Sequence, residues 1–180
     1  TSIQNTAFGA NALAGNVGGG SNTSVGALAL SSNQSGNNNT ALGSLALDAS
    51  ATGGNNTGVG ASALGSNLSG GSNTAVGVLA LFSNTSGGSN TAVGQAALSA
   101  NTTGFRNVAV GMNALAAATA SGNTAVGYLA LGANTTGASN AALGESALRA
   151  TTTGNGNTAV GHYAMELNTT GSSNTAVGAG

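Results

Sequence analysis

Apolar and polar residues recur along this chain with a fixed period. The motif N-T-A-V-G, or a close variant of it, begins at eleven asparagines: Asn5, Asn22, Asn39, Asn56, Asn73, Asn90, Asn107, Asn123, Asn140, Asn157 and Asn174. The interval is seventeen residues, except for one of sixteen between Asn107 and Asn123. A fixed period this short indicates a solenoid, in which each repeat forms one coil and the neighbouring coils cover its apolar side chains.

The aligned repeats give the consensus N-T-A-V-G-x-x-A-L-x-x-N-T-T-G-x-S, whose positions we call columns 1 to 17. Column 4 is mostly valine, with Phe8, Leu42 and Leu143 as exceptions, and column 9 is leucine in nine copies and Met165 in one. We predict that these two columns form a narrow core. Column 8 is alanine in all ten copies present, which predicts a close contact between two segments of the coil.

Glycine and asparagine mark the turns of each repeat. Glycine in column 5 and again near column 15 predicts two corners, and therefore two short strands, in each coil. Asparagine in columns 1 and 12 predicts ladders of amide hydrogen bonds from coil to coil. A helix is the competing interpretation for alanine-rich stretches such as 112–120, but glycine, threonine and asparagine recur too often for stable helices.

The repeat therefore predicts an all-β fold, a β-solenoid or parallel β-roll of about ten to eleven 17-residue coils, with residues 1–180 as a single domain. At roughly 4.8 Å per coil the rod would be on the order of 50 Å long. The sixteen-residue interval is explained most simply by a second turn that is one residue shorter. Because the core is thin relative to the number of residues that must be ordered, we expect an intertwined or side-by-side homo-oligomer. The chain begins and ends inside a repeat, so we also expect it to be a fragment of a longer fibrous chain.

Composition argues against several classes of function. Cysteine is absent, which removes disulfides and thiol chemistry, and the net charge of -1 without basic clusters predicts no binding of nucleic acid. The apolar runs are too short for a membrane helix, so we expect no membrane contact from this segment. Titratable residues are too sparse for an active site, so we predict no enzymatic activity, catalytic residue, cofactor or metal site. Asp48, Arg149 and Glu166 share column 10, an exposed and permissive position where the last two could pair.

One local concentration of aromatic and titratable residues stands out. Tyr128, Glu145 and His162 occupy column 6 of successive coils, and Tyr163 follows the last of them. Such a face suits contact with a glycan or a protein. The alternative is a variable, solvent-facing column that has collected large residues.

The run N-T-A-V-G-x-x-A-L-x-x-N-T-T-G resembles the head repeats of trimeric autotransporter adhesins, the YadA-like head, and related repeats of phage tail fibres. Residues 107–111, N-V-A-V-G, come nearest to the adhesin strand A-V-A-I-G. This chain departs in repeat length and in the threonine of column 2. The resemblance implies a left-handed parallel β-roll and a homotrimer at the bacterial cell surface or in a virion fibre. It also implies a structural or adhesive role towards a host-cell or surface ligand, such as a glycan or matrix protein.

An ice- or surface-binding, threonine-rich β-solenoid is the alternative function. Column 2 offers regularly spaced threonines: Thr6, Thr23, Thr40, Thr57, Thr74, Thr91, Thr124, Thr158 and Thr175. Strand alternation places each threonine on the same side as the column 4 valine, so a valine core predicts that these threonines are buried or lie at an interface. That expectation argues against ice binding. A polysaccharide-cleaving β-helix enzyme is a weaker alternative, because the chain lacks the paired carboxylates that this chemistry generally uses.

Overall fold

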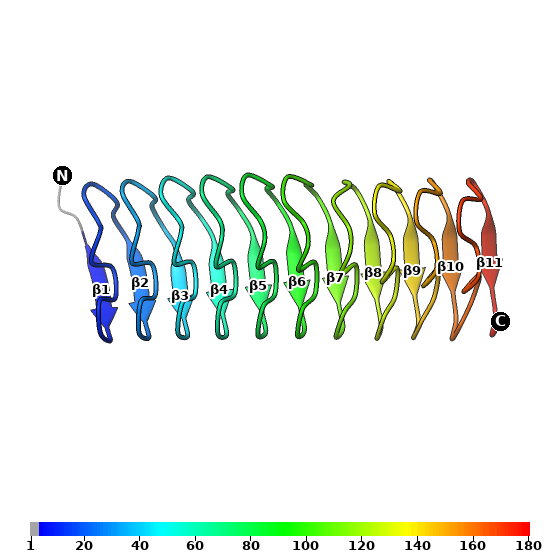
Figure 1. Cartoon of the computed structure of the whole chain (residues 1–180), viewed down its shortest axis with the longest axis horizontal. Helices are drawn as coiled ribbons and strands as arrows, with labels where there is room; N and C mark the ends of the chain where they lie inside the picture. The colour runs from blue at the N-terminus through cyan, green and yellow to red at the C-terminus, as the bar shows by residue number, and fades with distance from the viewer. Residues whose placement is uncertain (1–3) are drawn as a thin grey trace.

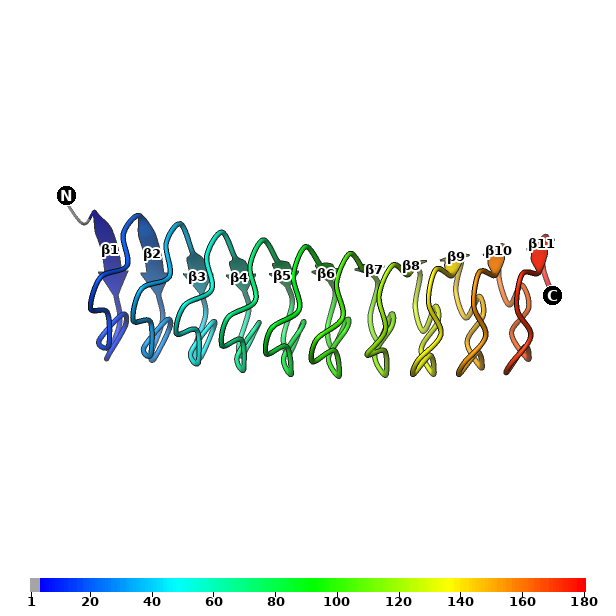
Figure 2. The same cartoon turned by 90° about the horizontal axis from the view of Figure 1, so that it is seen from above.

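One short parallel strand per coil, stacked in sequence order, forms the framework of the protein. The computed structural model describes residues 4–180, and none of these residues is helical. The eleven strands make a single sheet in the order β1 to β11, and they line one side of a rod (Figures 1 and 2). Their bounds are β1 Asn5–Phe8, β2 Asn22–Val25, β3 Thr40–Leu42, β4 Thr57–Val59, β5 Thr74–Val76, β6 Thr91–Val93, β7 Val108–Val110, β8 Thr124–Val126, β9 Ala141–Leu143, β10 Thr158–Val160 and β11 Thr175–Val177. The all-β solenoid predicted from the period is confirmed.

Neighbouring strands pair residues of the same column. Between β5 and β6, for example, Thr74, Ala75 and Val76 lie opposite Thr91, Ala92 and Val93. This register makes every column a straight ladder that runs along the rod. A side chain therefore meets its equivalents in the coils on either side of it.

The short repeat keeps the same register. Strand β7 pairs with β8 through Val108 opposite Thr124, although only sixteen residues separate them. Thr119 still donates its N–H to the carbonyl of Thr135, which is the column 13 partner, at 2.9 Å. Asn107 Nδ2 donates to the carbonyl of Ala120, where other coils use the column 15 glycine. The missing residue therefore falls between Thr119 and Ala120, which confirms the predicted shortening of the second turn.

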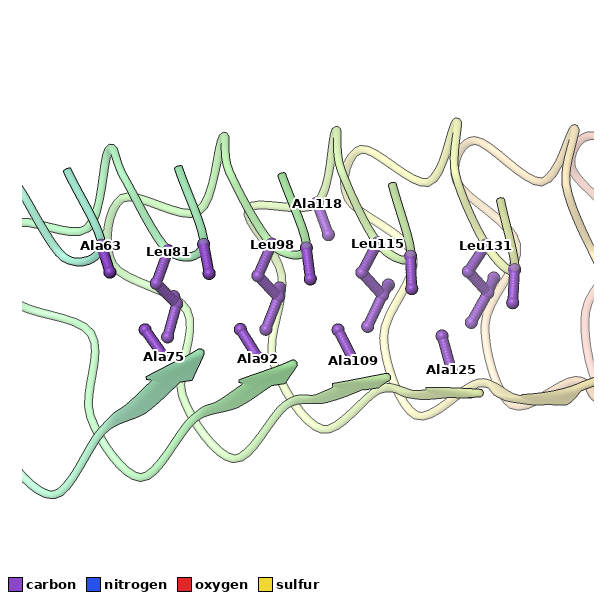
Figure 3. Close-up of a cluster of buried hydrophobic side chains, with 14 of the residues drawn as sticks. Ala63, Ala75, Leu81, Ala92, Leu98, Ala109, Leu115, Ala118, Ala125 and Leu131 are labelled. Carbon is purple, nitrogen blue, oxygen red and sulfur yellow. The ribbon is translucent and has the colours of Figure 1, made fainter. Parts of the chain in front are cut away.

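The core holds one large side chain per coil (Figure 3). The leucines of column 9, such as Leu81 and Leu98, project from one wall towards the column 3 alanines of the sheet, such as Ala75 and Ala92. All of these side chains are fully buried, and so are most alanines of column 8. Columns 3 and 8 lie close together, because Ser24 in column 3 donates its hydroxyl to the carbonyl of Ala29 in column 8 at 2.7 Å. The predicted close contact at column 8 is present inside the coil.

The prediction that column 4 lies in the core is wrong. Val76, Val93 and Val110 are 37%, 36% and 36% exposed, and Leu42 and Leu143 about half exposed. Successive residues of a strand point to opposite faces, so the alanine of column 3 and the valine of column 4 cannot both face inwards. Leucine from the opposite wall already fills the narrow interior, which leaves room only for a small residue, alanine in most coils, on the sheet side.

The predicted second strand of each coil is also absent. The opposite wall alternates between negative and left-handed backbone angles, with positive φ in columns 7 and 9, as in Leu79 (60°) and Leu81 (51°). Its N–H groups still bond between coils, since Leu79 donates to Ala61 O at 3.1 Å and Leu81 to Ala97 O at 2.9 Å. A left-handed leucine costs roughly 1–2 kcal/mol. The hydrogen bonds and the burial of the column 9 side chain offset that cost.

Two asparagine ladders fasten the coils, as the sequence predicts. In column 1, Asn73 Nδ2 donates to Gly87 O at 2.9 Å, and Asn73 Oδ1 accepts the N–H of Asn90 at 3.0 Å. In column 12, Asn84 Nδ2 donates to Asn67 Oδ1 at 2.7 Å and to Gly87 O at 2.9 Å. Buried amides need such partners. The column 1 amides from Asn5 to Asn157 close their own coil and also bond the next coil, whereas column 12 amides bond from coil to coil only where two asparagines are adjacent, and Asn134 and Asn168 close only their own coil.

Glycine in column 5 allows the backbones of adjacent coils to pack directly against each other. Gly77 has a φ of +135°, and a Cβ atom added there would lie 2.6 Å from the carbonyl oxygen of Gly94. Only glycine fits both the angle and the approach. The corner at column 5 thus also sets how closely the coils stack.

Candidate interaction surfaces

The column 6 cluster consists of Tyr128, Glu145, His162 and the adjacent Tyr163. The first three residues each follow a column 5 glycine, directly after strands β8, β9 and β10. Backbone bonds hold these coils together: Ser146 N–H donates to Tyr128 O at 2.8 Å, and Tyr163 N–H donates to Glu145 O at 3.0 Å. The three column 6 side chains therefore stand in a row along the rod.

The structure brings three members of this cluster into contact. His162 Nε2 lies 3.9 Å from Glu145 Oε1, and the rings of His162 and Tyr163 are 4.0 Å apart at an interplanar angle of 51°. Tyr128 is 42% exposed and stands one coil before Glu145. The cluster offers aromatic faces, a carboxylate and an imidazole on an open surface, which is a set of groups that can bind but has no enclosed reaction space.

Column 10 carries an ion pair. Arg149 Nη2 lies 2.8 Å from Glu166 Oε1 on the neighbouring coil, which confirms that the two residues pair. The arginine side chain is 48% exposed, so this ion pair contributes only about 0–1 kcal/mol. Asp48, in the same column, accepts a hydrogen bond from the hydroxyl of Ser31. These contacts support a structural role for column 10.

The outer side of the sheet forms a second surface, which we call the Thr–Val face. It consists of the outward side chains of columns 2 and 4 on strands β1 to β11, and these two columns contain no charged residue. None of the column 2 threonines is buried; they range from half-buried to exposed. Of the two alternatives predicted for these threonines, burial within the chain is therefore wrong, for the same reason that the valine core is wrong, whereas a position at an interface stays a prediction. Threonine and valine do share one side, but that side faces outwards.

Sequence reasoning missed this face because it took the larger apolar residue of the strand as the inner one. The signal that could have found it is column 3, which holds only alanine, serine or glycine in all eleven copies. A position that accepts nothing larger than serine is more constrained in volume than a column that accepts valine, leucine and phenylalanine. The tighter column is the inner one.

Other kinds of site are not evident in residues 4–180. This part of the chain has no detectable pocket, and no three of its histidine, aspartate and glutamate side chains gather as metal ligands would. Within the same residues no helix is long and apolar enough to cross a membrane. In comparisons with known proteins, no family model, no curated protein and no solved structure matches this chain.

Proposed function

We propose that this chain is a structural and adhesive segment of an extracellular fibre, such as an adhesin head or a tail-fibre shaft. The observation that carries the proposal is the uninterrupted stacking of eleven strands in one register, from β1 to β11, with every coil bonded to the next. The fibre is a homotrimer at a bacterial surface or in a virion, as the resemblance to adhesin head repeats implies. Its role is to project or form a binding surface, and it is not an enzyme.

The mechanics of the fold support this role. Each coil contacts only its neighbours, so the structure extends by repetition without a change of design. Asparagine ladders, strand ladders and the stacked column 5 glycines link the coils at several points of their circumference, which resists bending. Ten intervals of about 4.8 Å give a shaft roughly 50 Å long from this segment.

The column 6 cluster is the place on the shaft where we propose that a glycan or matrix protein binds. Tyr128 and Tyr163 supply aromatic surface, while Glu145 and His162 supply exposed polar groups on the same side. Aromatic residues beside polar groups are the usual anchors of such contacts. Elsewhere column 6 holds smaller or uncharged residues, such as Ala61, so the cluster is a local feature of the rod.

Two measurements test this function. Small-angle X-ray scattering should give a pair-distance distribution that fits parallel rods about 48 Å long, and a distribution that no such bundle reproduces would contradict the fibre. For the ligand site, binding of the purified protein to glycan arrays and matrix proteins should fall when Tyr128→Ser and His162→Ser are combined. Phe82→Ser, which changes an aromatic residue 38% exposed in another column, is the matched control and should keep binding. Equal loss in the control would remove the cluster from the proposal.

Ice or crystal-surface binding is the second candidate, and the outward position of the column 2 threonines favours it. Thr74 and Thr91 stand opposite each other on adjacent strands, so their hydroxyl and methyl groups repeat at the strand spacing. Thermal hysteresis of the protein at micromolar concentration tests this candidate. Activity that disappears in Thr91→Leu but survives in Thr102→Leu, a turn position, would support it, and absence of hysteresis in the unaltered protein would exclude it.

A further inference from the structure

We infer that the Thr–Val face is covered by the same face of further copies of this chain, so that it is the contact on which the proposed fibre assembles. This inference rests on the proposed fibre and names its partner surface. Sheets made only of parallel strands are generally covered on both sides. Here leucine and alanine cover the inner side (Figure 3), whereas the outer side of β1 to β11 carries no covering segment from residues 4–180 (Figure 2).

The composition of column 4 shows that this outer side is not an ordinary solvent surface. In eleven coils column 4 holds only valine, leucine or phenylalanine. Some of these side chains are half-buried in the single chain, and the others are exposed by fractions that range from 36% at Val93 to 78% at Val177. Column 6 lies two residues further along and is similarly exposed, yet it accepts glutamine, glutamate and histidine. A position that is exposed in the single chain and still apolar in every coil fits a surface that is buried in the assembly.

The size of the face is sufficient for a specific contact. Ten strand spacings of about 4.8 Å, and a width of three residues at about 3.3 Å each, give a plane of roughly 480 Å² per copy. Two facing copies bury about 960 Å² of plane and three converging copies about 1,440 Å², and the corrugated side chains add to both values. Specific interfaces begin at about 1,000 Å².

The period of the face selects another copy of this chain as the partner. Over eleven coils, only a surface with the same spacing along the rod keeps every valine opposite an equivalent residue. A second copy has the same spacing because it has the same sequence and fold. Both faces are uncharged, so no repulsion opposes their approach. A crystal lattice would need a uniform array, but Phe8, Leu42 and Leu143 project further than valine, and Ala141 replaces threonine. Protein side chains can repack around such irregularities, whereas ice cannot.

A pair of matched substitutions in one coil tests the inference. Val76→Glu places a carboxylate on the Thr–Val face, and Val78→Glu makes the same change two residues later in column 6, where Glu145 shows that glutamate is accepted. The two valines are 37% and 47% exposed in the single chain, so neither change buries a charge in the coil itself. Circular dichroism should show that both variants keep the β-solenoid. Sedimentation equilibrium then gives the mass of each protein.

We expect the unaltered protein to sediment as a multiple of the 16.6 kDa chain. Val76→Glu should weaken self-association roughly 100-fold or more, because a carboxylate would be desolvated against its own copies. Val78→Glu should leave the mass unchanged. A single 16.6 kDa species in the unaltered protein, or equal dissociation in both variants, would overturn the inference. A monomer that remains a rod by small-angle scattering would remove the homotrimer from the proposed function but keep the rod-shaped structural segment, and a monomer with thermal hysteresis would indicate that the face binds ice.

Discussion

Replacing Gly77 by alanine should weaken the rod more than any change of similar size on its surface. The added methyl group would lie 2.6 Å from Gly94 O and 2.7 Å from Gly94 C, and the backbone at Gly77 has a φ of +135°. The clash forces the two coils apart by roughly 0.6 Å, since Cβ contacts shorter than about 3.2 Å are rare. That displacement strains the bond from Gly94 N–H to Val76 O, which is now 2.8 Å.

The backbone strain and the weakened hydrogen bond together lower the free energy of unfolding by about 3 kcal/mol. A non-glycine residue in this backbone region costs about 1–3 kcal/mol, and a weakened hydrogen bond about 0.5–1.5 kcal/mol. For a chain of this length, 1 kcal/mol shifts the melting temperature by about 2–4 °C, so the Gly77→Ala variant should melt roughly 6–12 °C below the unaltered protein. Thermal denaturation followed by circular dichroism measures this shift. Hydrogen exchange should also quicken in the coils of β5 and β6.

Gly18→Ala is the matched control. At Gly18 φ is not positive, and the nearest atom to an added Cβ is Gln34 O at 3.9 Å, which is an ordinary contact. This variant should melt within about 2 °C of the unaltered protein, since surface changes of this kind are usually within about 0.5 kcal/mol. If Gly77→Ala melts no lower than Gly18→Ala, the close stacking of column 5 does not limit stability, and the reasoning is refuted.

Three further tests, two substitutions and one digestion, probe the core, the asparagine ladder and the resistance of the coils to proteolysis. Gly58→Ala should stabilise the protein by about 0.5–1 kcal/mol, because ten other coils hold alanine or serine there, and a small shift relieves the 3.2 Å approach to Ala63 O; a lower urea midpoint would contradict this. Ser50→Asn should add about 1–2 kcal/mol, because the buried Ser50 hydroxyl has no partner whereas asparagine would rejoin the column 12 ladder; an unchanged urea midpoint would show that the ladder adds nothing at this coil. Native protein should resist trypsin, whose only sites are Arg106 and Arg149, and rapid cleavage at both would mean that the coils are loosely held.

The sequence was sufficient to predict the solenoid, its coil number and both asparagine ladders, because each of these follows from spacing alone. A period of seventeen residues places equivalent residues of adjacent coils side by side, whatever the conformation inside the coil. The sixteen-residue interval could be explained by a shorter second turn, because the repeat that begins at Asn107 lacks one residue there. The pairing of Arg149 with Glu166 follows in the same way, since residues of one column on adjacent coils must be neighbours. The column 6 row was predictable for this reason, but its contact with a ligand is not a matter of spacing and stays a prediction.

The shape of the coil was not predictable by the same means. Leucine disfavours left-handed backbone, so nothing in Leu79 or Leu81 indicates that the second wall alternates between positive and negative φ instead of forming a strand. Local propensity fails there because hydrogen bonds to both neighbouring coils, repeated along the rod, outweigh the preference of each residue. The sequence shows a column of leucines, but the contacts between stacked coils determine the backbone conformation of these residues.

The narrowness of the coil explains both why the prediction of a column 4 core was wrong and why the chain has the apolar Thr–Val face that we assign to assembly. A coil that holds one leucine accepts from the sheet only a residue no larger than serine, as Leu98 against Ala92 illustrates (Figure 3). The β-branched residue that gives the strand its propensity, Val93, must then point outwards. A thin solenoid built in this way cannot bury all the apolar residues that its own strands need. The chain therefore carries an apolar face as a consequence of its fold, and in the assembly that we propose a copy of the same period would cover that face along its whole length.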